Sequence, residues 1–108
     1  MKQFYAAHLE HKRRFSESFE THPYECGWAD EAIFFININD VQGEAAELNA
    51  WVQISLDGVH WADEGTQFEP MSEPGLYFVK VVHFGNYLRL AVDVQGDFDL
   101  QIQIACKG

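Results

Sequence analysis

The chain has 108 residues, of which 47% are hydrophobic and 15% aromatic, so it is long enough for one domain with a real core and too apolar to be disordered. Its net charge of −10 at pH 7 makes it repel nucleic acid and anionic membranes. Its apolar runs, such as residues 32–36, are too short to cross a bilayer. We therefore expect neither nucleic acid nor a membrane as a partner.

The charge is unevenly distributed along the chain. Residues 1–14 carry a net charge of +3, whereas the remainder carries −13, with three basic residues against sixteen acids. The basic residues of the first segment are Lys2, Lys12, Arg13 and Arg14. We predict that residues 1–14 form a basic N-terminal arm, either solvated or docked on an acidic surface, and that residues 15–108 form the folded domain.

The N-terminus gives an expectation about location. Residues 1–8 lack the long apolar stretch of a secretory signal peptide. We therefore expect a cytoplasmic or virion-associated protein.

Alternation of apolar and polar residues predicts strands in chain order over 15–20, 32–39, 48–56, 76–84, 87–94 and 98–106. Residues 32–39 are apolar on both faces in their first half, which places them centrally in a sheet. Residues 40–47 are predicted to be a connection through Gly43, and residues 67–75, with two prolines, an irregular loop. The pattern is typical of an all-β, antiparallel β-sandwich, jelly-roll or immunoglobulin-like, of about seven strands.

The stretch 48–61 predicts a hairpin. Leu48, Ala50, Val52, Ile54 and Leu56 alternate with Asn49, Trp51, Gln53 and Ser55, so the first set is expected in the core and the second outside. Asp57-Gly58 is the strongest signal for a two-residue type I′ turn. With that turn Leu56 faces Val59, Ile54 faces Trp61, and Trp61 lies on the buried face.

A tight turn is predicted at Gln95–Asp97, with Phe98, Leu100, Ile102, Ile104 and Cys106 facing inward after it. A three-residue turn places Asp93 opposite Asp99, and a calcium ion or a cationic partner would relieve their repulsion. A five-residue loop would separate the two acids. Both arrangements remain open.

The two cysteines, Cys26 and Cys106, lie 80 positions apart and belong to no Cys-x-x-Cys motif. They can pair in a sandwich or remain reduced thiols, and the sequence leaves both readings open.

Residues that support catalysis are few. The sequence lacks a glycine-rich phosphate loop, a nucleophile elbow and a zinc-binding helix motif. His8 and His11 have no third ligand nearby in sequence, and His60 and His83 lie on predicted strands without an activated partner. We expect no enzymatic activity, no metal site and no cofactor.

Outward aromatic residues are the better indication of function. Trp51 shares a face with Asn49 and Gln53, Trp28 lies in a loop, and Tyr77 and Tyr87 lie on strands. Alternatively, a second sheet or the N-terminal segment covers Trp51 and buries it. If exposed, these rings suit a protein partner or a stacked sugar.

Three stretches carry a family resemblance: Trp51–Trp61, Gly75–Val81 and Tyr87–Leu90. With their Ser-x-Asp-Gly-x-x-Trp hairpin they resemble small β-sandwich modules of bacteriophage virion proteins and bacterial accessory proteins. They are also similar to discoidin-type carbohydrate-binding domains, which are longer and usually carry terminal cysteines. The resemblance implies a binding or assembly module and transfers neither a ligand nor a catalytic residue.

We therefore predict a non-enzymatic protein-binding module, an accessory or decoration subunit of a larger particle, that binds a protein partner or forms a homo-oligomer. The predicted contact residues are Trp28, Trp51, Tyr77 and Tyr87, with Lys12, Arg13 and Arg14 as an electrostatic arm. The alternative is a carbohydrate-binding module that stacks sugars on exposed tryptophan.

Overall fold

The computed structural model describes residues 4–8, 14–82 and 84–108, which contain eight strands and no helix. The strands are β1 (Phe4–His8), β2 (Arg14–Phe15), β3 (Phe19–Glu20), β4 (Tyr24–Glu25), β5 (Glu31–Ser55), β6 (Ala62–Gln67), β7 (Gly75–Val82) and β8 (Tyr87–Lys107). All strand pairs are antiparallel and belong to one sheet. Among the described residues, a helix long and apolar enough to cross a membrane is not found.

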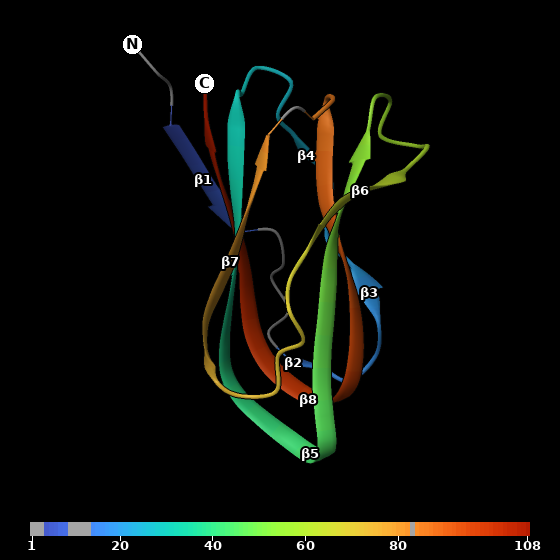
Figure 1. Ribbon diagram of the computed structural model, residues 1–108, viewed down its shortest axis with the longest axis vertical. Helices are drawn as coiled ribbons and strands as arrows, with labels where there is room; N and C mark the ends of the chain where they lie inside the picture. Colours follow the sequence, from blue (N-terminus) through green and yellow to red (C-terminus); the bar gives the residue numbers. More distant parts are fainter. Residues whose placement is uncertain (1–3, 9–13, 83) are drawn as a thin grey trace.

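The architecture is built on the two long strands β5 and β8, which pair along their whole length. Their register runs from Glu31↔Lys107 to Gln42↔Asp97, breaks, and resumes from Glu47↔Gln95 to Ser55↔Tyr87. Figure 1 shows that both strands bend together at the lower end of the molecule. The sheet therefore folds over on itself and forms two layers.

We call these layers A and B. Layer A contains β7, residues 31–42 of β5, residues 97–107 of β8, and β1. Layer B contains β6, residues 47–55 of β5 and residues 87–95 of β8, with β3 and β4 on the far side of β8. This arrangement confirms the predicted all-β sandwich, and it confirms the central place of residues 32–39, which lie between β7 and β8.

The core lies between the layers and is formed by alternate residues of the two long strands. The predicted inward residues after position 97 are all at most 1% exposed. An exposure of at most 2% is found for Leu48, Ala50, Val52, Leu88, Leu90 and Val92. Residues of both layers form one apolar cluster, which includes both cysteines. Burial of this size is the main force that holds the two layers together.

The bend itself corrects two predictions. Residues 40–47 and 95–97 are not a connection and a tight turn between separate strands, because β5 and β8 continue through them and bend into the other layer. Gly43 and Gly96 have φ of 113° and 100°, and a Cβ on Gly43 would lie 3.5 Å from the Gly96 Cα. Alternation shows which face of a sheet a residue occupies, but it does not show where a strand passes from one layer to the other. The sequence therefore predicts two strands within β5 and two within β8.

Asp93 and Asp99 are consequently not opposite each other. Asp93 pairs with Asn49 in layer B, whereas Asp99 pairs with Asp40 near the bend. Of the two arrangements left open by the sequence, the structure therefore excludes the one that places Asp93 opposite Asp99.

The segment after β5 also differs from the prediction. β5 ends at Ser55, β6 begins at Ala62, and Ile54 pairs with Ala62 in place of Trp61. Residues 56–61 therefore form a six-residue loop and not a two-residue hairpin turn. Leu56, predicted in the core, is 75% exposed.

Hydrogen bonds of one carboxylate explain this loop. Asp57 Oδ1 accepts from the backbone N–H of Val59 at 2.8 Å and of His60 at 2.9 Å. Ser55 Oγ donates to the same oxygen and accepts from the Gly58 N–H at 2.8 Å. These local bonds compete with strand pairing and replace the type I′ geometry.

Candidate interaction surfaces

Trp51 lies half-buried on the outer face of layer B, in the row that the alternation assigns to that face. Its indole Nε1 donates to Asp63 Oδ1 at 3.1 Å, and Gln53 Nε2 donates to the same oxygen at 3.0 Å. Asp63 belongs to β6, so the pairing of β5 with β6 sets the orientation of the ring. A ring held in this way loses little conformational entropy when it binds a ligand.

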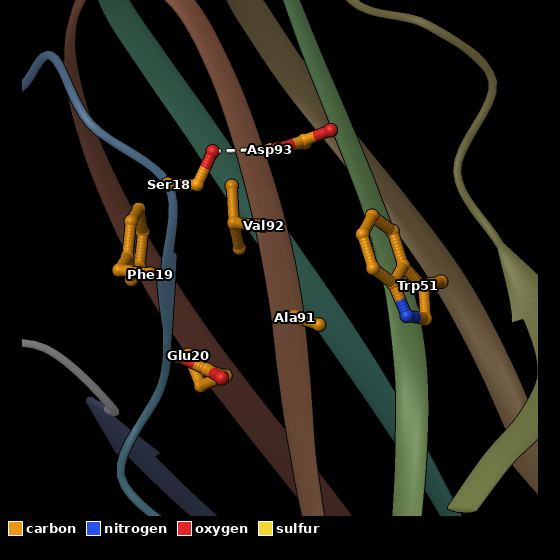
Figure 2. A pocket seen from close by; sticks show the side chains of 7 residues that line it. All are labelled: Ser18, Phe19, Glu20, Trp51, Ala91, Val92 and Asp93. Atoms are coloured by element: carbon orange, nitrogen blue, oxygen red, sulfur yellow. Dashed lines mark hydrogen bonds between the residues drawn. The ribbon is translucent and has the colours of Figure 1, made fainter.

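Two hollows flank Trp51. One, of about 210 Å³, has Ala91–Asp93 as its floor and Ser18, Phe19 and Glu20 on the side opposite the indole (Figure 2). Ser18 donates to the Asp93 carboxylate, which faces this hollow. The other hollow, of about 300 Å³, is lined by Trp51, Asp63, Gly65 and Gln67. The arrangement offers an aromatic ring with carboxylates on both sides and the amide of Gln67 on one.

Trp61 belongs to the same face, although the sequence predicted it in the core. Arg89 lies over its ring, 4.1 Å from the centroid, and donates from Nε to Gln53 Oε1 at 2.8 Å. Trp61 is only partly buried. The assumed hairpin register hid this residue, so sequence reasoning missed it as a surface aromatic.

The other predicted aromatic contacts lie apart from Trp51. Trp28 is 38% exposed in the loop between β4 and β5, against the C-terminal Gly108. Tyr77 faces the core opposite Ile36, and its hydroxyl donates to the Glu73 carbonyl at 2.8 Å. Tyr87 begins β8 and packs over Gly58. The structure therefore does not bring the four predicted rings onto one surface.

The predicted basic arm is described only in part. Residues 4–8 form β1, which pairs with β8. Arg14 lies at the bend, with Nε 2.7 Å from Asp97 Oδ1 and Nη2 3.4 Å from Asp40 Oδ2. Lys2, Lys12 and Arg13 lie outside the described residues, so their role and the boundary at residue 14 stay predictions.

The predicted polar sites can also be located. His60 is fully exposed in the loop 56–61, with Nδ1 2.7 Å from Asp57 Oδ2, and this contact raises the pKa of His60. The side chains of His8, His11 and His83 lie outside the described part of the chain. Within that part, the side chains of His, Cys, Asp and Glu form no group of three that could hold a metal ion.

The two cysteines are free thiols in the core. Burial raises the pKa of Cys26 to about 12, with smaller contributions from nearby Cys106 and Glu25, and burial raises the pKa of Cys106 to about 11. Neither thiol is set up as a nucleophile, because the thiolate is disfavoured at both positions.

The sequence analysis missed the outer face of layer A. On this face the register aligns four rows of three residues across β7, β5 and β8. They are Leu76–Asn37–Gln101, Phe78–Phe35–Gln103, Lys80–Ile33–Ala105 and Val82–Glu31–Lys107. Leu76, Phe78 and Val82 are 63%, 57% and 48% exposed. The sequence signal that could have predicted this face is the stretch 76–82, in which both faces of the strand carry apolar residues.

Half of the twelve residues of this face are apolar, and the face is poor in acids. Phe35 and Phe78 contact each other with ring centroids 6.2 Å apart. Glu31 is the one acid among the twelve residues, in a chain that has seventeen, and Lys80 and Lys107 are the cations. A hollow of about 180 Å³ lies at its upper end between these three residues and Ile33. Such a surface fits a macromolecular contact better than free solvent.

Comparison with known proteins supports the fold. No family model matches the sequence, and no curated protein is detectably similar to it in sequence. Among solved structures, the SPBc2 prophage-derived protein YomS superposes with a TM-score of 0.67 at 8% identity, over 100% of this chain and 96% of that chain. A chain of infectious bursal disease virus, Gx strain, superposes with a TM-score of 0.58 at 11% identity, over 99% of this chain and 33% of that chain.

At these identities the likeness concerns the fold alone. It does not extend to the Ser-x-Asp-Gly-x-x-Trp hairpin, whose expected turn geometry is absent here. The chain thus shares its sandwich fold with a prophage-derived protein and with part of a viral chain.

Proposed function

We propose that the chain is a non-enzymatic assembly module, an accessory or decoration subunit of a larger particle in the cytoplasm or on a virion, that binds a protein partner through the outer face of layer A. The observation that carries the proposal is the exposure of Leu76, Phe78 and Val82 beside Phe35. Contiguous apolar patches of a few hundred Å² mark interaction sites on soluble proteins.

Two further observations support an assembly role. Across this face β7, β5 and β8 pair in a continuous register, so a partner can dock on a preformed sheet surface. In addition, the sandwich fold occurs in a prophage-derived protein and in a chain of a virus structure.

The test is affinity capture with wild-type protein and two variants as bait. We expect wild-type protein to retain one partner in stoichiometric amount, either a further copy of the chain or another protein. Phe78→Glu should lose that partner, because it places a charge in the centre of the contact. Leu56→Glu, which makes the same change in charge on an exposed residue of the loop 56–61, should retain it.

The proposal fails if wild-type protein retains no stoichiometric partner, or if Phe78→Glu retains the partner as well as wild type does. The Leu56→Glu control separates a specific loss from the general effect of one added negative charge.

A second candidate function rests on Trp51. The indole is fixed by Asp63 and has a hollow on each side, with carboxylates in both and the amide of Gln67 in one. These are the elements of a sugar-binding site: a ring to stack on and acceptors for hydroxyl groups. We propose a neutral glycan as the ligand in this case, since Glu20, Asp63 and Asp93 would repel an acidic sugar.

Titration of a neutral glycan panel, followed by tryptophan fluorescence, tests this candidate. Binding should change the emission of wild-type protein and leave that of Trp51→Phe unchanged at this site, while Trp28→Phe serves as the matched control. If no glycan changes the emission, or if the change persists in Trp51→Phe, the sugar-binding role of Trp51 is excluded.

A further inference from the structure

We infer that the ligand of Trp51 is a linear neutral oligosaccharide that crosses the outer face of layer B at right angles to the strands and occupies both hollows. This inference rests on the sugar-binding candidate proposed above and specifies the form of its ligand. Three observations favour it: the row of residues in which Trp51 lies, the size of the two hollows and the polar groups inside them.

The two hollows lie in one row of residues across layer B. The register pairs Trp51 with Gln67 of β6 on one side and with Ala91 of β8 on the other. Ala91 in turn pairs with Glu20 of β3. Since adjacent strands are about 4.8 Å apart, the row extends about 14 Å from β6 to β3. Trp51 lines both hollows, so a ligand that occupies both crosses the strands and passes the indole (Figure 2).

A ligand that follows β5 meets a filled position. The next residue of β5 on the outer face is Gln53. Its Nε2 donates to Asp63 and its Oε1 accepts from Arg89, so both polar ends of this side chain are already bonded. Neither Gln53 nor Asn49, the next outward residue in the other direction, lines either of the two hollows. The open path therefore runs across the strands.

The size of the hollows favours a ligand of more than one sugar unit. Their volumes are about 210 and 300 Å³, which together give about 510 Å³. Ligand pockets of proteins commonly measure about 300–1,000 Å³, and the smaller hollow alone falls below this range. That hollow exists because Ala91 carries only a methyl group between Trp51 and Glu20. A single sugar unit would leave one of the two hollows empty.

Each hollow contains an acceptor for a sugar hydroxyl. The bonds from Trp51 and Gln53 both go to Asp63 Oδ1. The bond from Ser18 goes to Asp93 Oδ1. The second carboxylate oxygen of each acid takes no part in these bonds. An ionised carboxylate accepts hydrogen bonds and donates none, so these oxygens suit the hydroxyl donors of sugar units on both sides of the indole.

Titration of oligosaccharide ladders, followed by tryptophan fluorescence, tests the inference. The probes are malto-, cello-, manno- and N-acetylchito-oligosaccharides, each from the monosaccharide to the hexasaccharide. We expect wild type to bind one of these ladders. Its dissociation constant should fall at least about tenfold from the monosaccharide to the longer members, as expected for one further hydrogen bond to a charged group. The dissociation constant should then level off, because both hollows are filled.

Two variants test the hollows separately. Glu20→Ala removes the carboxylate opposite the indole in the smaller hollow, and Gln67→Ala removes the amide of the larger one. Both residues are exposed, so neither exchange threatens folding. Each variant should lose the gain with chain length and bind the longer members about as weakly as the monosaccharide. Glu73→Ala is the matched control and should keep the gain, because this exposed acid before β7 lines neither hollow.

The outcomes separate the inference from the sugar-binding role itself. If the monosaccharide binds as tightly as the longer members, Trp51 binds one sugar unit and only the inference fails. If no member of any ladder changes the emission, both fail. A gain with chain length that persists in Glu20→Ala and in Gln67→Ala also overturns the inference, because the chain then lies elsewhere.

An oligoarginine peptide, titrated in parallel, tests the charge of the ligand. Glu20, Asp63 and Asp93 attract a cation, and a guanidinium group can stack on an indole. A change in emission caused by this peptide and by no sugar would show that the site binds a cation, and it would overturn both the inference and the sugar-binding role. We expect the neutral ladder to bind and the peptide to leave the emission of Trp51 unchanged.

Discussion

At the scale of single residues, Asp57 shows how one side chain changes a local structure. Its carboxylate accepts two backbone hydrogen bonds and one from Ser55, and it contacts the His60 ring. The hydrogen bonds from the His60 N–H and ring, and from the Val59 N–H, hold the pKa of Asp57 far below its usual value of 3.8. The loop 56–61 is therefore organised by a charged acceptor.

The pH dependence of this loop follows from the two pKa shifts. Since the pKa of His60 is raised above 6.5, its contact with Asp57 contributes fully below pH 6.5 and is lost as the pH rises through the folded-state pKa. Since the pKa of Asp57 is lowered, its contribution is full above pH 3.8 and is lost as the pH falls toward the folded-state pKa. The loop should be best ordered between these two limits.

NMR titration of the histidine ring protons measures this effect. We expect His60 to titrate above 6.5 in wild type and closer to 6.5 in Asp57→Asn, in which the charged acceptor is gone. His22, which lies outside this contact, is the internal control. A wild-type His60 that titrates at or below 6.5 would contradict the observed contact.

The cysteines give a second prediction at this scale. With pKa values of about 12 and 11, Cys26 and Cys106 hold almost no thiolate at neutral pH, and both side chains are enclosed. We expect both thiols to resist alkylation in native buffer. In denaturant, both should be alkylated during an exposure to the reagent of the same length. Rapid native labelling of either cysteine, detected by mass spectrometry, would show that this part of the core opens.

At the scale of the elements, the bend shared by β5 and β8 is the critical feature. A Cβ on Gly96 would lie 2.7 Å from the Ala46 Cβ and 3.0 Å from the Gln42 carbonyl oxygen. Gly96 also has a φ of 100°, a region that residues with a side chain rarely adopt. The two strands can cross between layers side by side only because this position has no side chain.

Gly96→Ala should therefore destabilise the protein. Gly65→Ala is the matched control, because Gly65 has a φ of 114° and no atom within 4 Å of an added Cβ. Both variants carry the backbone cost of about 1 kcal/mol, and Gly96→Ala adds a steric cost of about 1–3 kcal/mol. Urea unfolding measures the difference, and equal stability of the two variants would contradict a crowded bend.

The short strands β3 and β4 pair with β8, and Thr21 joins the segment between them to the same strand. Thr21, between β3 and β4, is 2% exposed, donates from its N–H to the Leu90 carbonyl and accepts from the Leu90 N–H through Oγ1, both at 2.9 Å. We expect Thr21→Val to cost about 1–3 kcal/mol, because it leaves a buried N–H without an acceptor. Thr21→Ser should retain most of the stability in the same urea experiment, since it keeps the hydroxyl.

At the scale of the whole molecule, the sandwich separates two chemically different surfaces. The outer face of layer B carries Trp51 with Asp63 and Asp93, whereas the outer face of layer A is apolar and carries Lys80. This asymmetry within a chain of net charge −10 lets one surface associate while the other stays hydrated.

Self-association of the chain, one of the two kinds of partner named under the proposed function, should therefore strengthen with salt. Each copy carries −10, so the long-range repulsion between two copies is screened when the Debye length falls from about 30 Å at 0.01 M to about 8 Å at 0.15 M salt. Sedimentation at these two ionic strengths should give a lower dissociation constant at the higher one. The opposite trend would indicate a contact held mainly by ion pairs between subunits.

Much of the fold could be predicted because burial leaves a periodic record in the sequence. The alternation over 87–94 and 98–106 identified the core-facing residues, and the doubly apolar stretch 32–39 identified a central strand. The same logic failed at Leu56 and Trp61, where a side-chain hydrogen-bonding pattern replaced the expected turn. The face carried by Leu76, Phe78 and Val82 was missed because both sides of that strand are apolar.

The sequence by itself determined that this protein is all β, which alternate residues of 98–106 face the core and how acidic the chain is, because composition and period-two alternation are local properties. Only the tertiary structure shows that β5 and β8 each contribute residues to both layers and that Trp51 lies between two hollows. It also decided that the apolar residues of β7 and β5 form one acid-poor face. These features depend on which distant segments pair, and a long-range register leaves no local pattern to read.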